Sequence, residues 1–73
     1  MERFFVYSLE RGRPIRLIWQ EDDGALRQAN VQVTSWDGQV VQAAALRPKR
    51  ALSLRVEQIL SADYKKGDDG ATD

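Results

Sequence analysis

The sequence predicts a mainly β domain, in which five short strands curl into a small closed or nearly closed barrel beside an N-terminal helix. Apolar and polar residues alternate over much of residues 15–64, which is the pattern of half-buried strands. Two Asp-Gly pairs, Asp23-Gly24 and Asp37-Gly38, stand between alternating segments and are typical of hairpin turns. In a chain of 73 residues a flat sheet would expose hydrophobic edges, so closure of the sheet is favoured.

The N-terminal segment, residues 2–11, is predicted to be a helix, although its apolar start also has strand propensity. Phe5 and Leu9 stand four residues apart, so both would lie on one helix face and cap a mouth of the barrel. Gly12 stands where the residue after a helix commonly takes a left-handed conformation, and Pro14 follows it. The helix is therefore expected to end just before this glycine.

Five strands are predicted after this corner, with short turns between them. They cover residues about 15–20, 26–34, 39–46, 51–56 and 59–64. The third of these strands is rich in valine and alanine, which indicates a crowded interior or the close approach of another element. Glu57-Gln58 is expected to form a short turn or one turn of 3₁₀ helix before the last strand.

The chain divides into one folded domain, residues 1–64, and a flexible acidic tail, residues 65–73, which contains almost nothing apolar. The formal net charge is zero, but the charges are unevenly placed. All eleven Lys and Arg residues lie within 1–66, while 67–73 holds three aspartates and no base. The mildly basic body permits an anionic partner without demanding one.

The chain contains no cysteine and no histidine. Disulfides, thiolate metal sites and the commonest general base are therefore excluded, and no serine has a base placed by a motif. We expect a non-enzymatic protein with no cofactor and no metal site. No stretch approaches the roughly 20 apolar residues of a membrane span. We therefore expect no membrane partner and a cytoplasmic location, with which the absence of cysteine agrees.

Three segments of the chain follow the layout of a known family. They are Leu9–Trp19, Ser35–Gly38 and Leu54–Ile59. In this layout the chain resembles the WYL domain, a small SH3-like or Sm-like β-barrel of bacterial transcription regulators. The Trp-Tyr-Leu tripeptide of the family is absent at 39–42, and Gln58 stands where the family has a second arginine. The resemblance implies an SH3/Sm-like barrel and a regulatory or sensory role in binding nucleic acid or a small ligand. It carries over one basic position, Arg55.

Two clusters of basic residues are the candidate binding site, one at the helix-to-strand corner and one around the third connection. The candidate residues for binding nucleic acid or an anion are Arg13, Arg16, Arg47, Lys49, Arg50 and Arg55. In a barrel this small the two clusters could share one face, and Trp19 and Trp36 would add a stacking plane for unstacked bases. The alternative is that the arginines are solvated and Trp19 is buried in the core. Trp36 either packs over the barrel edge or marks a contact site.

Two functions are compatible with these features. The first is a non-enzymatic regulatory or sensory module that binds a small anionic ligand or single-stranded nucleic acid through the basic residues. The second is a protein-interaction or oligomerisation module, whose partner is another protein or a second copy of the chain. It would use Trp36 and an exposed edge of the valine–alanine strand at 39–46.

Overall fold

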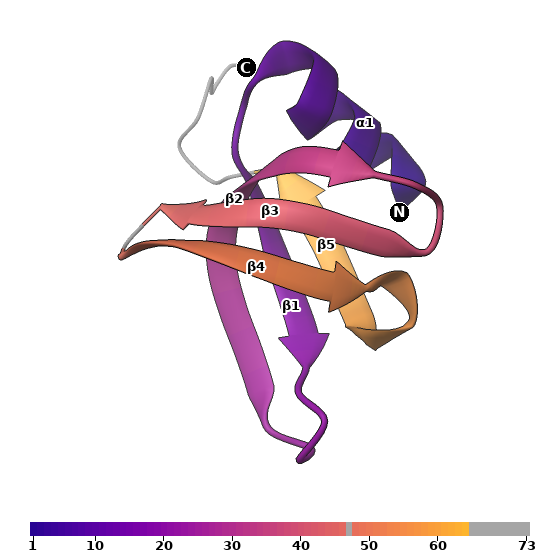
Figure 1. The fold of residues 1–73 in the computed structure, drawn as a ribbon, viewed down its shortest axis with the longest axis vertical. Coiled ribbons are helices and arrows are strands. Elements are labelled where there is room, and N and C mark those ends of the chain that lie inside the picture. The colour runs from indigo at the N-terminus through magenta and orange to yellow at the C-terminus, as the bar shows by residue number, and fades with distance from the viewer. Residues whose placement is uncertain (47, 65–73) are drawn as a thin grey trace.

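The computed structural model describes residues 1–46 and 48–64, and within them it shows one helix packed against one sheet (Figure 1). The helix α1 spans Glu2–Arg11 and is followed by five strands and a 3₁₀ turn. The strands are β1 (Ile15–Gln20), β2 (Leu26–Trp36), β3 (Val40–Leu46), β4 (Lys49–Arg55) and β5 (Ile59–Tyr64), with the turn η1 (Val56–Gln58) before β5. The prediction of a mainly β domain with five strands and an N-terminal helix is confirmed. The predicted tail, residues 65–73, lies outside the described residues.

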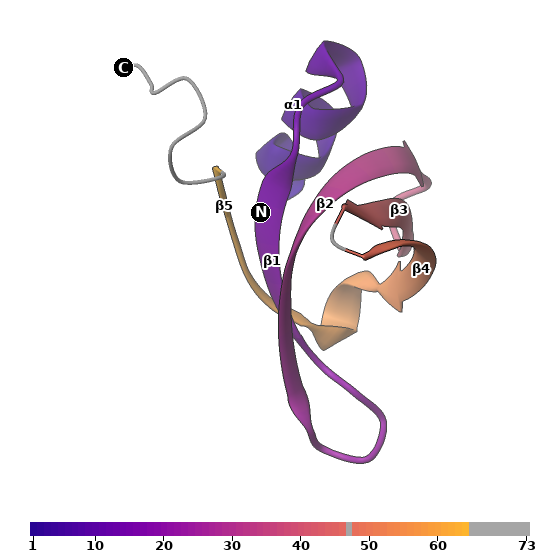
Figure 2. The ribbon, with the colours of Figure 1, turned by 90° about the vertical axis from the view of Figure 1, so that its left-hand side faces the viewer.

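The five strands form a single antiparallel sheet in the order β4-β3-β2-β1-β5. The long strand β2 pairs with β1 through its first half and with β3 through its second half. The sheet therefore bends around its interior, with β3 and β4 on one side and β1 and β5 on the other (Figure 2). Closure into a barrel is not confirmed, because β4 and β5 stand at the two ends of the strand order.

Two register shifts accompany this bending. In β2 the register moves between Val33 and Ser35, so Thr34 is an extra residue opposite β3. In β5 the extra residue is Leu60, between the partners of Ile18 and Trp19. Such bulges increase local twist and bend a strand, which is how five strands of modest length can wrap around one core.

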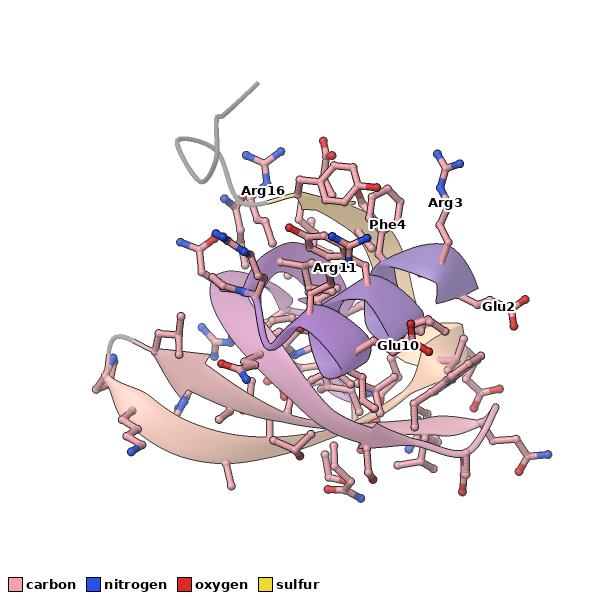
Figure 3. All side chains as sticks on the ribbon, turned by 90° about the horizontal axis from the view of Figure 1, so that it is seen from above. Glu2, Arg3, Phe4, Glu10, Arg11 and Arg16 are labelled. Atoms are coloured by element: carbon pink, nitrogen blue, oxygen red, sulfur yellow. The ribbon has the colours of Figure 1, made fainter. Side chains whose placement is uncertain are left out.

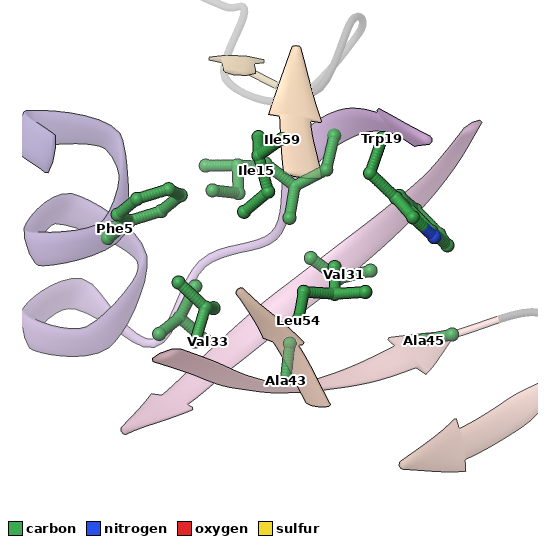
Figure 4. Close-up of a cluster of buried hydrophobic side chains, with 11 residues drawn as sticks. Phe5, Ile15, Trp19, Val31, Val33, Ala43, Ala45, Leu54 and Ile59 are labelled. Carbon is green, nitrogen blue, oxygen red and sulfur yellow. The ribbon is translucent and has the colours of Figure 1, made fainter. Parts of the chain in front are cut away.

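The core consists of apolar side chains on the inner face of the sheet together with one helix residue (Figure 4). Its buried members are Phe5, Ile15, Leu17, Trp19, Val31, Val33, Val41, Ala43, Ala45, Leu54 and Ile59. Trp19 belongs to this core, as one of the two interpretations of the sequence predicted, and its indole Nε1 donates a hydrogen bond of 2.8 Å to Glu21. In β1 the alternation of Ile15, Leu17 and Trp19 in the sequence agrees with the side chains that face inward.

The helix lies on the sheet through a different face from the one predicted. Phe5 is buried, but Leu9 is 42% exposed, so the prediction that both cap the sheet is wrong. The buried face of α1 is centred on Phe5 and Ser8, and it extends toward Tyr7, whose ring meets the ring of Tyr64 at 4.9 Å. The aromatic contacts with β5 turn the helix away from the Leu9 side.

Ser8 is the one buried polar side chain among the described residues, and it links three segments of the fold. Its hydroxyl donates to the backbone oxygen of Arg13 at 2.6 Å and accepts from the backbone N–H of Val33 at 2.9 Å. The helix ends at Gly12, which has φ 65° and donates its N–H to the backbone oxygen of Ser8. The left-handed conformation predicted for Gly12 is confirmed, and it directs the chain into β1.

The valine–alanine strand β3 is an interior strand. It pairs with β2 on one side and with β4 on the other, so the prediction that it offers an exposed edge is wrong. Its small inward residues, Ala43 and Ala45, are buried because they face the bent interior between the two halves of the sheet. The unpaired edges of the described sheet belong to β4 and β5.

Candidate functional site

Arg55, the basic residue that the family resemblance carries over, lies at the end of β4 in a network of side chains. Its Nη2 donates to Asp22 Oδ1 at 3.2 Å, and its Nε donates to Glu57 Oε2 at 3.0 Å. These hydrogen bonds, that to Asp22 first, raise the pKa of Arg55 above its usual value. The guanidinium is thus already occupied by two carboxylates of the chain itself.

Gln58, at the position where the resemblance to the WYL domain would imply a second arginine, completes this network. Its Oε1 accepts from the backbone N–H of Arg55 at 3.0 Å, and its Nε2 donates to the backbone oxygen of Gln20 at 3.1 Å. A weaker contact of 3.4 Å joins the same nitrogen to Asp22 Oδ1. An amide is suited to this position because it both donates and accepts, whereas an arginine only donates.

Two open hollows flank Arg55. The first, of about 450 Å³, is lined by residues 38–40 and 55–57. The second, of about 370 Å³, is lined by Gln20, Glu21, Asp22, Arg55, Glu57 and Gln58. In the second hollow three carboxylates face one guanidinium, so its electrostatic potential disfavours an anion. The carboxylates around Arg55 therefore make it an unfavourable position for binding a phosphate.

Arg16 and Lys49, one from each predicted cluster, lie on the same face of the sheet. The register aligns Tyr64, Ile15, Val31, Ala45 and Arg50 across all five strands. Ile15, Val31 and Ala45 are buried, so neighbouring residues along each strand point to the opposite, outer face. Arg16 and Lys49 are such neighbours, and both point to solvent.

The outer-face row between them is defined by Asp63, Arg16, Asn30, Leu46 and Lys49. Arg16 pairs with Asn30 and with Asp63, and Leu46 pairs with Lys49. Because Val31 pairs with Ala45, the next residues, Asn30 and Leu46, lie side by side. Arg16 and Lys49 are thus three strand spacings apart, about 14 Å along the sheet. Asn30 could not be singled out from the sequence, because only the register places it between two cations.

The ionic environment of this row differs from that of Arg55. Arg16 has one partner there, Asp63, at 3.8 Å on an exposed surface. Within residues 1–46 and 48–64, neither Lys49 nor Arg50 makes an ion pair. Figure 3 shows Arg16 projecting outward at the end of the helix where Arg11 also lies. The outer-face row therefore has cations that remain accessible to an external anion.

The other predicted site residues are placed as follows. The side chain of Arg13 is exposed and its backbone oxygen accepts from Ser8. Arg50 is exposed on the edge strand β4, opposite Ala45. Arg47 lies outside the described residues. The fold brings Arg16 and Lys49 into one row of the outer face. Arg55 shares this face, because it follows the buried Leu54, but it lies six residues further along β4 than Lys49, about 20 Å away.

Trp36 packs against the core rather than projecting from the turn. Its ring centroid lies 5.7 Å from that of Phe5, with the rings tilted by 54°. Its Nε1 is buried and has no hydrogen-bond partner among the described residues. The interpretation that Trp36 packs over the sheet edge agrees with this contact, while a role in binding stays a prediction.

A cluster of aromatic side chains not predicted from the sequence joins the helix to β5. The rings of Phe4 and Tyr7 each lie 4.9 Å from that of Tyr64 in edge-to-face geometry, and Tyr64 is 48% exposed. The guanidinium carbon of Arg3 lies 5.3 Å from the centre of the Phe4 ring. The indication of this cluster in the sequence was the spacing of Phe4 and Tyr7, which stand three residues apart and so share one helix face.

The described residues contain no group of three or more His, Cys, Asp or Glu side chains arranged to hold a metal ion. No helix in the described part of the chain is both long and apolar enough to cross a membrane. Comparisons with protein-family models, with curated proteins and with solved structures found no match to this chain. The resemblance to the WYL domain therefore stays a prediction.

Proposed function

We propose that this chain is a non-enzymatic binding module, with a regulatory or sensory role, that takes an anionic partner on the outer face of its sheet. The observation that carries the proposal is the register that places Arg16 and Lys49 on one exposed face with Asn30 between them. A single-stranded nucleic acid fits this surface, because its phosphates recur along the strand and can meet the two cations in turn. The side-chain amide of Asn30, between them, can form a hydrogen bond to the nucleic acid. A small anionic ligand would use one cation of the same row.

The contrast with Arg55 supports the choice of the outer-face row. Arg55 would have to leave Asp22 and Glu57 before it could bind a phosphate, and those two carboxylates would repel the phosphate. Among the residues that the structure describes, Arg16 would have to leave only Asp63, and that exposed contact of 3.8 Å is weak. Lys49 has no such competitor among the described residues.

We also propose that the fold is an SH3/Sm-like barrel of the WYL type in a bacterial cytoplasmic protein. The meander of β1 to β4, the return of β5 to the far side of β1, and the 3₁₀ turn between β4 and β5 support the barrel. The bend of β2 at Thr34 supports it too, because bends of this kind let strands curl toward closure. The absence of cysteine is compatible with a reducing cytoplasm.

Fluorescence anisotropy with a labelled single-stranded oligonucleotide tests the binding proposal. The logarithm of the affinity should fall with the logarithm of the salt concentration, by about 0.7 per phosphate contacted. The double variant Arg16→Gln/Lys49→Gln should bind more weakly and with a shallower salt dependence. The matched control is Arg27→Gln/Arg55→Gln, which removes two charges that are paired with Glu21, Asp22 and Glu57. Equal losses in the two variants, or no binding by the wild type at low salt, would refute the proposal.

A second candidate function is supported by the unpaired edges of β4 and β5. Within residues 1–46 and 48–64 no further strand pairs with either edge, so its backbone N–H and C=O groups can pair with a strand of another protein or of a second copy. Light scattering over a range of concentrations tests self-association. A monomer at every concentration would exclude pairing between copies.

A further inference from the structure

The end of β5 lies beside the outer-face row. Tyr64, the last residue described, pairs with Ile15, and its neighbour Asp63 pairs with Arg16. The Asp63 carboxylate already lies 3.8 Å from the Arg16 guanidinium. The chain therefore leaves the sheet one strand away from the cation that the proposed function assigns to the ligand.

Two lysines follow Tyr64, and the segment after them is opposite in charge to this surface. Beyond Lys65-Lys66 the sequence reads Gly67-Asp68-Asp69-Gly70-Ala71-Thr72-Asp73, with three carboxylates and no base. This segment contains two glycines and no large apolar side chain, so it has no hydrophobic surface to bury. Its carboxylates are the groups through which it can make contacts. Its chemistry is that of a polyanion, which is the kind of partner proposed for the row.

The lengths match as well. Asp69 is five residues after Tyr64 and can reach up to about 17 Å, and Asp73 can reach about 30 Å. Along the sheet, Arg16 is one strand spacing from β5, about 5 Å, and Lys49 is four spacings away, about 19 Å. The first two aspartates can therefore reach Arg16, and the last can reach Lys49, without any change in the sheet.

We propose that the acidic segment 67–73 binds in cis to the outer-face row and competes there with the anionic ligand. This inference rests on the proposed function for the identity of the competing ligand. Contacts between exposed charges are weak one by one, but the tether holds the carboxylates at a high effective concentration. The segment thus lowers the affinity of the row for weak anions, and only a ligand that makes several contacts displaces it.

The test uses the full chain with Asp68→Asn/Asp69→Asn. The control, Glu2→Gln/Glu10→Gln, removes the same number of charges from the helix, where both glutamates are exposed (Figure 3). Affinity for a single-stranded oligonucleotide should rise about threefold to tenfold in the aspartate variant and much less in the control. The gain should vanish near 1 M salt, where the Debye length is about 3 Å.

A measurement without ligand separates this inference from the proposed function. In ¹H–¹⁵N spectra, the aspartate variant should shift the Arg16 Nε–Hε and Lys49 amide signals, and the control should leave them in place. If these signals shift but no variant binds the oligonucleotide, the contact in cis stands and the proposed function fails. If the two variants gain affinity equally, or if the signals do not move, the competition in cis is wrong whatever the chain binds.

Discussion

The helix side of the sheet and the η1 side are both held by polar contacts between segments far apart in the chain. On the helix side, the Ser8 hydroxyl links α1 to Arg13 and to Val33, and it is fully buried beside Phe5. On the η1 side, Gln58 links Arg55 to Gln20, with its hydrogen bonds exposed. A broken bond on the first side leaves a buried donor without water, whereas on the second side water replaces the lost partner.

This difference indicates which side is free to change. The helix side contributes most to the free energy of unfolding, because its apolar and polar contacts are excluded from solvent. The η1 side and the outer-face row expose their charged groups, so substitutions there should alter binding or pH response with little loss of stability. The predictions below are ordered from the largest expected effect to the smallest.

The largest effect is expected from Phe5→Ala. It removes a buried aromatic ring that also contacts Trp36, and should lower the free energy of unfolding by about 3–5 kcal/mol. For a domain of this size such a loss is a large part of the total stability. Urea denaturation measures it, with Leu9→Ala as the control. If Leu9→Ala lowered stability as much as Phe5→Ala, the observed face of the helix would be wrong.

The next largest effect is expected from Ser8→Ala. Loss of the hydroxyl leaves the Val33 N–H without its partner in a buried position, and the free energy of unfolding should fall by about 1–3 kcal/mol. Ser53→Ala, on an exposed position of β4, is the matched control and should have little effect. Hydrogen exchange at the Val33 amide should accelerate in the Ser8 variant alone. An unchanged exchange rate there would contradict the role given to Ser8.

A smaller effect is expected from Gln58→Ala on the η1 side. Its hydrogen bonds to Arg55 and Gln20 are exposed, so the loss should be about 0.5–1.5 kcal/mol by thermal or urea unfolding. Gln42→Ala on the outer face of β3 serves as the control, since no hydrogen bond of its side chain is described. A loss as large as that of Ser8→Ala would remove the distinction between the two sides.

The smallest effect concerns Asp37 and its response to pH. Its Oδ1 accepts from the backbone N–H of Val40 at 2.8 Å and of Gln39 at 2.9 Å, and these bonds lower the pKa of Asp37 below its usual value. A lowered pKa in the folded state stabilises the fold above the unfolded value, about pH 4, and this contribution is lost as the pH falls through the folded value. Asp37→Asn keeps an acceptor but does not titrate, so its difference in stability from the wild type should shrink below about pH 4. A difference that stays constant with pH would contradict the assigned cause.

The strands and the core were predictable from the sequence because they depend on local patterns. Alternation places Ile15, Leu17 and Trp19 on one face, and Gly12 supplies the left-handed residue that ends the helix. The orientation of the helix was not predictable, because Tyr64, which lies more than fifty residues away, decides it through Phe4 and Tyr7. The spacing of apolar residues within the helix favours the burial of Phe5 and of Leu9 equally.

The candidate site was predictable only in part. Composition and clustering identified Arg16 and Lys49, but their common face depends on the register of four strands, which alternation alone does not fix. The hydrogen bond between Arg55 and Asp22 was not predictable either, because the two residues are 33 positions apart in the sequence. The interior position of β3 likewise follows from strand order, which similar local patterns in neighbouring strands cannot specify.

The most direct test is an NMR titration of the full chain with a short single-stranded oligonucleotide. Amide and side-chain signals of Arg16, Asn30 and Lys49 should shift together and saturate at one concentration, while those of Arg55 and Glu57 stay in place. Shifts centred on Arg55, or a spectrum that does not change at low salt, would contradict the claim that the outer-face row binds anions.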